Sequence, residues 1–204
     1  MPIAINGSGT VTGISVGGLP DGIVDTDMIA ANAVTAPKKG SGSILQVQSS
    51  IKKDTASFEL SSGYFSNSTQ TGIQVSITPS NASNKILLFG MINVDVAGEQ
   101  YNIGVVFDKG GSIISGAQAD AAGSRKLVTA LGDASRNSSY SETMNLHYLD
   151  TAGGTSAITY GLAVNNPSSI SRIVYINRSV TDGNDQYTRR AVSTLTAMEI
   201  AVWI

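Results

Sequence analysis

The side chains able to do acid–base or nucleophilic chemistry are few in this chain. It has no cysteine, which excludes a thiol nucleophile, a thiolate metal site and a disulfide framework. Its one histidine, His147, lies between Asn145 and Leu149 on the polar face of an expected strand. A Ser-His-Asp triad would have to use His147, and no Gly-x-Ser-x-Gly element accompanies it. We therefore expect a structural or surface role for His147 and no enzyme activity.

Acidic side chains lie near the ends of several expected strands, where two of them could meet as a glycosidase pair. They are Asp120, Asp133, Glu142, Asp150, Asp182 and Asp185. The run Asp182-Gly183-Asn184-Asp185 has oxygen ligands at a calcium-like spacing, but it lacks the downstream glutamate of an EF-hand. An Asp-Gly turn explains it better. Without a His/Cys pair for zinc or a glycine-rich phosphate loop, the sequence predicts no metal and no cofactor.

Aromatic and basic residues in the expected loops are candidates for binding. Tyr140 and Tyr187 are the loop tyrosines, and Tyr187 lies beside the pair Arg189-Arg190. With Arg136 and Asn137 they offer aromatic faces and polar forks of the kind that hold sugars. We predict these four residues, Arg136, Asn137, Tyr140 and Tyr187, as receptor contacts. Packing within the loop is the alternative for each tyrosine.

The composition limits the partners. The net charge is −2, only 14% of residues are charged, and lysines and arginines are scattered, so we expect no nucleic-acid and no membrane partner. The 22 glycines among 204 residues, with much Ser, Thr and Asn, indicate a β-rich, turn-rich protein. No apolar run approaches the length of about 18 residues that a membrane helix needs. The N-terminus lacks signal-peptide features, so we expect no secretion.

The elements that must position these loops are strands, and the most informative one runs from Lys85 to Val96. At a two-residue period one face holds Ile86, Leu88, Ile92, Val94 and Val96, and the other holds Leu87, Phe89 and Met91. Gly90 and the β-branched residues disfavour a helix. A strand that is apolar on both faces must be covered on both. No amphipathic helix is available, so a second copy of the chain is the economical cover.

Further strands are expected at short intervals beyond Ser43, with Gly- and Ser-rich turns between them. They cover residues 44–52, 58–65, 72–78, 85–96, 101–108, 125–131, 144–149, 158–165, 172–178 and 191–204. Residues 117–122 allow a helical turn, and no other helix is expected here. About ten strands predict an all-β, jelly-roll β-sandwich. Because the last strand is also apolar on both faces, we place Leu195 and Ala197 with Leu87, Phe89 and Met91 at an interface between subunits.

Residues 1–42 differ from the rest and contain a degenerate ten-residue repeat. Units starting at Gly22 and Asn32 each have Val in the third place, followed by Asp or Thr. Two such units cannot fold alone. Several chains side by side would bury a shared set of apolar residues along one axis, namely Ile23, Val24, Met28, Ile29 and Val34. We predict an attachment arm or stalk over 1–42 and a head over 43–204; an unstructured leader is the alternative for the arm.

Several motifs resemble bacteriophage structural proteins. Residues 9–22, Gly-Thr-Val-Thr-Gly-Ile-Ser-Val-Gly-Gly-Leu-Pro-Asp-Gly, and the ten-residue pair resemble the shaft repeats of tail fibres. Residues 72–80, 85–88 and 193–200 resemble a small domain common in marine and freshwater phages, of cyanophage type. The resemblance covers most of the chain. It implies a homotrimeric virion protein with a head similar to C1q or tumour necrosis factor, whose subunits associate through their inner sheets.

The resemblance implies a role in the virion, and two such roles stay open. The first is a short tail fibre whose head contacts the host surface, with a surface glycan as the candidate receptor. The second is a capsid-decorating fibre or cement protein that stabilises the phage shell. In both, the arm joins other virion proteins and assembly takes place in the host cytoplasm. An enzyme acting on surface polysaccharide is a third hypothesis, which the missing site chemistry disfavours.

Overall fold

The structure is a computed structural model. It describes residues 4–5, 11–12, 29–30, 33–34, 38–98, 102–121, 123–133, 139–166 and 168–202. The chain divides into two units, Met1–Gly40 and Ser41–Ile204. In the first unit, β1 (Ala4–Ile5) pairs antiparallel with β2 (Val11–Thr12). Across the described ranges, no helix is long and apolar enough to cross a membrane.

The apolar residues assigned to the arm are only partly described. Ile29 is 43% exposed and Val34 is 48% exposed. Ile23, Val24 and Met28 lie outside the described residues. Burial of this set between several chains stays a prediction.

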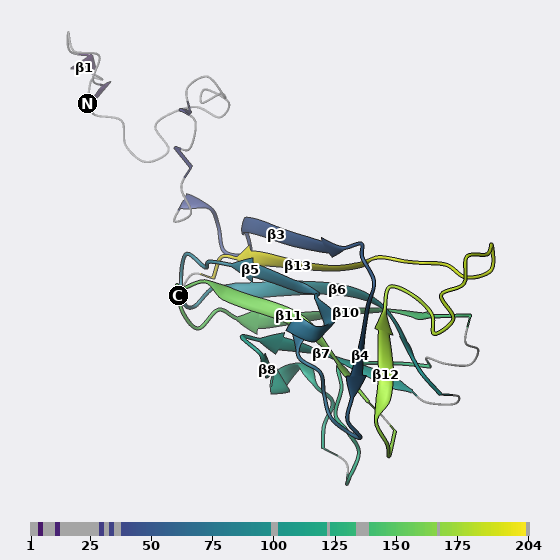
Figure 1. Cartoon of the computed structure of the whole chain (residues 1–204). Helices are drawn as coiled ribbons and strands as arrows, with labels where there is room; N and C mark the ends of the chain where they lie inside the picture. Colours follow the sequence, from purple (N-terminus) through teal and green to yellow (C-terminus); the bar gives the residue numbers. More distant parts are fainter. Residues whose placement is uncertain are drawn as a thin grey trace. The chain divides into compact units, whose positions relative to one another are not determined.

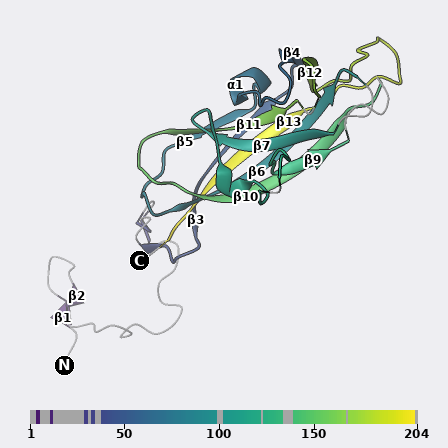
Figure 2. The same ribbon diagram turned by 90° about the horizontal axis from the view of Figure 1, so that it is seen from below.

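The second unit is a sandwich of two antiparallel sheets (Figures 1 and 2). One sheet contains β3 (Ile44–Lys52), β4 (Ala56–Leu60), β6 (Lys85–Val96), β10 (Glu142–Thr151), β12 (Arg172–Ile176) and β13 (Ser193–Ile200). The other contains β5 (Gln74–Ile77), β7 (Ile103–Lys109), β8 (Ser112–Ile113), β9 (Ala130–Gly132) and β11 (Ile158–Asn165).

The strand order is that of a jelly roll. In the first sheet β10 pairs along one side of β6, while β13 and then β12 pair along the other. Four neighbouring strands run β3-β13-β6-β10, and in the facing sheet four run β5-β11-β7-β9. Numbered by position in the chain, these eight strands have the orders 1-8-3-6 and 2-7-4-5, which two wound Greek keys produce. The predicted all-β jelly-roll sandwich is therefore confirmed.

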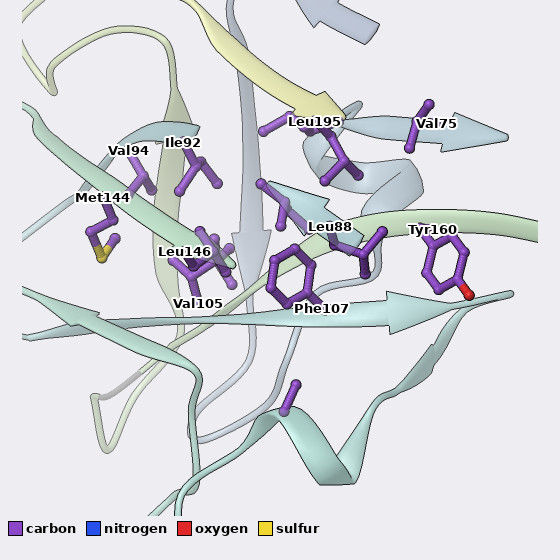
Figure 3. Packing of buried hydrophobic residues seen from close by; sticks show 14 of the residues in the cluster. Val75, Leu88, Ile92, Val94, Val105, Phe107, Met144, Leu146, Tyr160 and Leu195 are labelled. Atoms are coloured by element: carbon purple, nitrogen blue, oxygen red, sulfur yellow. The ribbon is translucent and has the colours of Figure 1, made fainter. Parts of the chain in front are cut away.

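The core lies between the two sheets and is made by the inward faces of alternating strands. Figure 3 shows Leu88 and Leu146 of one sheet facing Phe107 of the other, and these side chains belong to one buried cluster. The inward residues of β6 are buried in the predicted pattern, from Ile86 to Val96. Each large side chain removed from water contributes about 1.5–3 kcal/mol, so this shared layer holds the two sheets together.

The last strand corrects one prediction. Leu195 and Ala197 point into the core and are 0% exposed, so their assignment to an interface between subunits was wrong. The inward face of β13 also holds the buried polar residues Ser193 and Glu199. The inward face of β13 is therefore less hydrophobic than its outward face. A prediction from composition alone would place the outward face in the core.

A short helix was missed in the loop before β5. Helix α1 (Ser68–Thr71) begins with a capping box, in which Asn67 accepts from the backbone N–H of Gln70 and Gln70 accepts from that of Asn67. It ends at Gly72, whose φ is 71°. The spacing of Asn67, Gln70 and Gly72 is the sequence signal for such a turn. A 3₁₀ turn, Ser115–Ala117, overlaps the predicted helical turn only at Ala117.

Candidate interaction surfaces

The outward side of β3, β13, β6 and β10, here called the outer face, is the first candidate. Cross-strand pairing aligns its residues in rows. The rows are Val47–Met198–Leu87–Leu149, Ser49–Thr196–Phe89–His147 and Ile51–Thr194–Met91–Asn145. These rows contain no Asp, Glu, Lys or Arg. Val47, Ile51, Phe89 and Leu149 are each 46–53% exposed, so large apolar side chains on several strands form one uncharged surface.

Phe89 and His147 lie at the centre of the outer face. Their ring centroids are 6.3 Å apart and the ring planes are inclined by 38°. Together with Met91 and Asn145 they line a shallow depression. Leu87, Phe89 and Met91 thus lie on the outward side of β6, as the alternation predicts, and His147 lies beside them. Contact of these residues with another subunit stays a prediction.

The chain enters the second unit at one end of this sheet. The N–H of Gly42 donates to the carbonyl of Ala201 at 2.8 Å, and the N–H of Ala201 donates to the carbonyl of Ser43 at 2.9 Å. Residue 42 and residue 201 therefore lie side by side, and we call this the entry end. It is also the Lys85 end of β6, because Ile200 pairs with Lys85.

A buried carboxylate links the segments that meet at the entry end. Glu199 is 1% exposed. It accepts from Gln46 Nε2 at 2.6 Å, Asn84 Nδ2 at 2.6 Å, and the N–H and hydroxyl of Ser80, both at 2.7 Å. Burial raises the pKa of Glu199, but these hydrogen bonds outweigh it and the pKa lies below its ordinary value. The carboxylate joins β3, β13 and the turn before β6.

The opposite end carries the long loop between β12 and β13, which projects beyond the strands in yellow-green in Figure 1. Its neck is closed by the N–H of Ala191, which donates to the carbonyl of Asn177 at 3.1 Å. Asn177 has a φ of 62°. Its side-chain nitrogen donates to the carbonyls of Lys52 at 2.9 Å and Asp54 at 2.8 Å. We call this part of the sandwich the loop end.

Asp95 ties the same loop to the outward side of β6. It is 0% exposed and accepts from the N–H of Val180 at 2.7 Å and of Val96 at 2.8 Å. Burial raises the pKa of the Asp95 carboxyl to about 6, although these two N–H groups and Arg178 act to lower it. The outer face is thus open around Phe89 and covered by the loop around Asp95.

The loop is ordered from within by two aspartates. Asp182 binds Arg190 through two contacts of 3.0 and 2.6 Å, and this bond lowers the pKa of Asp182. Asp185 Oδ1 accepts from the N–H of Tyr187 at 2.7 Å and of Thr188 at 2.9 Å. Thr188 Oγ1 also donates to the carbonyl of Gly183, and these bonds hold a bend over residues 184–187. Among the described residues, no group of three or more His, Asp or Glu is placed to hold a metal.

Two of the predicted receptor contacts line one pocket at the loop end. Tyr140 is 63% exposed and Tyr187 is 70% exposed. The pocket has a volume of about 290 Å³, and its described lining is Asn93, Ser139, Tyr140, Ser141, Tyr187, Arg189, Arg190 and Ala191. Arg136 and Asn137 lie outside the described residues. Sequence reasoning missed Asn93, because a polar residue inside an apolar strand gives no signal of a pocket.

The remaining acidic residues hold the structure or lie at its surface. Asp150 accepts from Lys109 Nζ at 2.8 Å and from the Tyr160 hydroxyl at 2.7 Å, which joins the two sheets. Burial, reinforced by Asp150, raises the pKa of Tyr160. Asp120 and Asp133 are exposed, and Glu142 is half-buried. The geometry around Asp150 is that of a structural ion pair.

Comparison with known proteins does not assign this chain to a family. No family model and no curated protein matches the chain. Among solved structures, infectious bursal disease virus strain Gx aligns at 11% identity and a TM-score of 0.39, over 79% of this chain and 39% of that one. The VP2 subviral particle of the same virus aligns at 11% identity and a TM-score of 0.34, over 77% and 37%. The chain thus spans under two-fifths of the length of these neighbours, and its fold is defined by its own strand order.

Proposed function

We propose that this protein is a non-enzymatic structural component of a phage virion, a homotrimeric short tail fibre whose head contacts the host surface. The observation that carries the proposal is the uncharged, apolar outer face. The resemblance of residues 9–22 to tail-fibre shaft repeats supports the virion assignment.

Another copy of the same chain is the partner that suits the outer face. The centres of protein interfaces are depleted in charged residues and enriched in aromatic residues and Met. The three rows of the outer face carry no charge and include Phe89, Met91 and Met198. Each 100 Å² of apolar surface that association buries, at about 25 cal/mol per Å², contributes about 2.5 kcal/mol before the entropy cost of association. A contiguous apolar surface that is exposed across several strands often marks an interaction site.

The two ends of the sandwich support an orientation for the fibre. The arm joins the head at the entry end, beside Ala201, and the pocket with Tyr140 and Tyr187 lies at the loop end. The nine residue steps of β6 from Lys85 to Val94 span about 30 Å at about 3.3 Å per residue. In the proposed fibre the arm faces the particle and the loop end faces the host.

The mass of the full chain in solution tests the trimer. We expect three times the chain mass of 21.1 kDa by light scattering. Phe89→Asp should give monomer or aggregate. Leu131→Asp is the matched control, because Leu131 is 63% exposed on β9 of the facing sheet and should leave the mass unchanged. A monomeric wild-type chain, or a native-mass Phe89→Asp variant, would overturn the assignment.

Gold-labelled antibody against residues 43–204, imaged on intact particles, tests the position in the virion. Label at the tail or baseplate is the expected result. Label spread over the head would instead make the protein a capsid-decorating fibre or cement protein, and adding it back to bare shells should then raise their stability. Particles without label would overturn both roles.

A further inference from the structure

We propose that the loop-end pocket binds a sugar residue that carries a carboxylate. The inference deepens the proposed function, because it names the chemistry of the host contact. Tyr140 and Tyr187 are far apart in the sequence, because Tyr140 precedes β10 and Tyr187 precedes β13. The fold brings the two tyrosines to one pocket of about 290 Å³, close to the lower end of the range for small-ligand sites.

The tyrosines supply apolar faces in a polar surrounding. Tyr140 and Tyr187 are 63% and 70% exposed, so their rings are open to a ligand. A sugar ring has C–H groups on its faces and hydroxyls at its edge, and a tyrosine ring with a polar tip matches both. Ser139, Ser141 and Asn93 supply polar groups in the same lining.

The charge of the lining selects for an anion. Arg189 and Arg190 both line the pocket, and no described lining residue is a carboxylate. Asp182 binds Arg190 through Nε and Nη2 and fixes that side chain in place. Arg189 is exposed and has no described ion-pair partner. Its planar fork matches a carboxylate with two parallel hydrogen bonds.

Asn93 adds an acceptor. It is 3% exposed, and its side-chain nitrogen donates to Thr143 Oγ1 at 2.9 Å. Its side-chain oxygen is buried and has no hydrogen-bond partner among the described residues. A buried acceptor without a donor costs free energy. A ligand hydroxyl would supply the missing donor only where the Asn93 amide turns toward the pocket that the residue lines, because the oxygen itself is buried.

The pocket is organised before any ligand arrives. Asp185 orients the backbone at Tyr187, and the neck between Asn177 and Ala191 fixes where the loop leaves and rejoins the sandwich. A preformed site loses less conformational entropy on binding. In a trimer three such pockets would act together, so weak single sites would hold a repeating polysaccharide by avidity.

Titration of the full-length protein by ligand-observed NMR tests the inference, with methyl β-glucuronide, methyl β-glucoside and acetate as probes. We expect the glucuronide to bind about tenfold or more tightly than the glucoside, the effect of one charge-assisted pair, and acetate not to displace it. Tyr187→Ala should weaken binding of both glycosides about tenfold. Arg189→Gln should abolish the preference for the glucuronide.

Two control variants keep the result interpretable. Tyr64 is 68% exposed and does not line the pocket, so Tyr64→Ala should leave both affinities unchanged. Lys126→Gln removes an exposed cation elsewhere and should do the same. Equal affinity for the two glycosides, displacement by acetate, no binding at all, or an equal effect of Tyr64→Ala would each overturn the inference. A trimer that binds neither glycoside overturns only this inference, whereas a monomer that binds the glucuronide overturns only the trimer.

Discussion

Asn177 and Ala191 close the loop between β12 and β13 with one backbone hydrogen bond of 3.1 Å. Asn177 reaches this position only in the left-handed region, with a φ of 62°. Its side chain then bridges to the carbonyls of Lys52 and Asp54, and Ser193 Oγ donates to its side-chain oxygen at 2.6 Å. One residue therefore joins three segments of the chain, at residues 52–54, at Ala191 and at Ser193.

Replacing Asn177 should destabilise the head. Asn177→Ala removes the side-chain hydrogen bonds in a buried site and places a less tolerant residue at positive φ, and together these cost about 2–4 kcal/mol. Asn177→Gly is the matched control, because it relieves the backbone strain but not the lost hydrogen bonds, and should fall about 1 kcal/mol closer to wild type. Denaturant unfolding measures both. Equal stability of Asn177→Ala and wild type would contradict this account.

Asp95 should make the protein more stable as pH falls from neutrality towards 4. Its folded pKa of about 6 lies above the ordinary value of 3.8, so the folded state holds the proton more tightly than the unfolded state. The free energy of unfolding then rises on acidification through pH 6, by up to about 3 kcal/mol from this group. Unfolding curves between pH 4 and 8 measure the effect, and Asp95→Asn should flatten it. A wild-type curve without this rise would contradict the prediction.

Ionised Glu199 should stabilise the folded state, and protonation of Glu199 at low pH should lower the free energy of unfolding. Its folded pKa lies below the ordinary value of 4.5, so its stabilisation is present above pH 4.5 and is lost as pH falls through the folded pKa. At neutral pH, Glu199→Gln should cost about 2–3 kcal/mol, because an amide nitrogen would face donors such as Asn84 Nδ2. Glu59→Gln, at an exposed position of β4, should change stability by under about 0.5 kcal/mol. Comparable losses in the two variants would count against the network.

Gly90 should resist enlargement. A Cβ at this position would lie 3.1 Å from two methyl carbons of Leu162 and 3.3 Å from one of Leu146. Gly90→Ala should therefore destabilise by about 1 kcal/mol or more through overpacking, despite the better strand propensity of alanine. Gly154→Ala is the control, because a Cβ there meets nothing within 4 Å. Thermal unfolding compares the two, and a stabilised Gly90→Ala variant would show that the core has room.

The sequence predicted the alternation of β6 fully, because both of its faces follow the two-residue period with apolar residues. It did not predict which side of β13 faces inward. Glu199 and Ser193 are buried there by partners far along the chain, including Gln46, Asn84 and Asn177. Periodicity gives the two faces of a strand, but only the assembled partners decide which face is buried.

The pocket at the loop end was also only partly predictable from the sequence. Tyr140 and Tyr187 were predictable as loop aromatics from their neighbours in the sequence. Their meeting depends on the left-handed turn at Asn177 and on the internal bonds of Asp185, and neither gives a periodic signal. Asn93 was not predictable, because its role follows from a loop that begins more than eighty residues later.

The pairing of Gly42 with Ala201 makes the head a transplantable module. Its two chain ends leave the sandwich side by side, so residues 41–202 can be inserted into a surface loop of another protein without stretching the host backbone. The same proximity permits circular permutation, in which a short linker joins the present ends and new ones open at Gly110-Gly111. That turn has φ values of 60° and 84° and open space around both residues, so cutting it would expose no core residue.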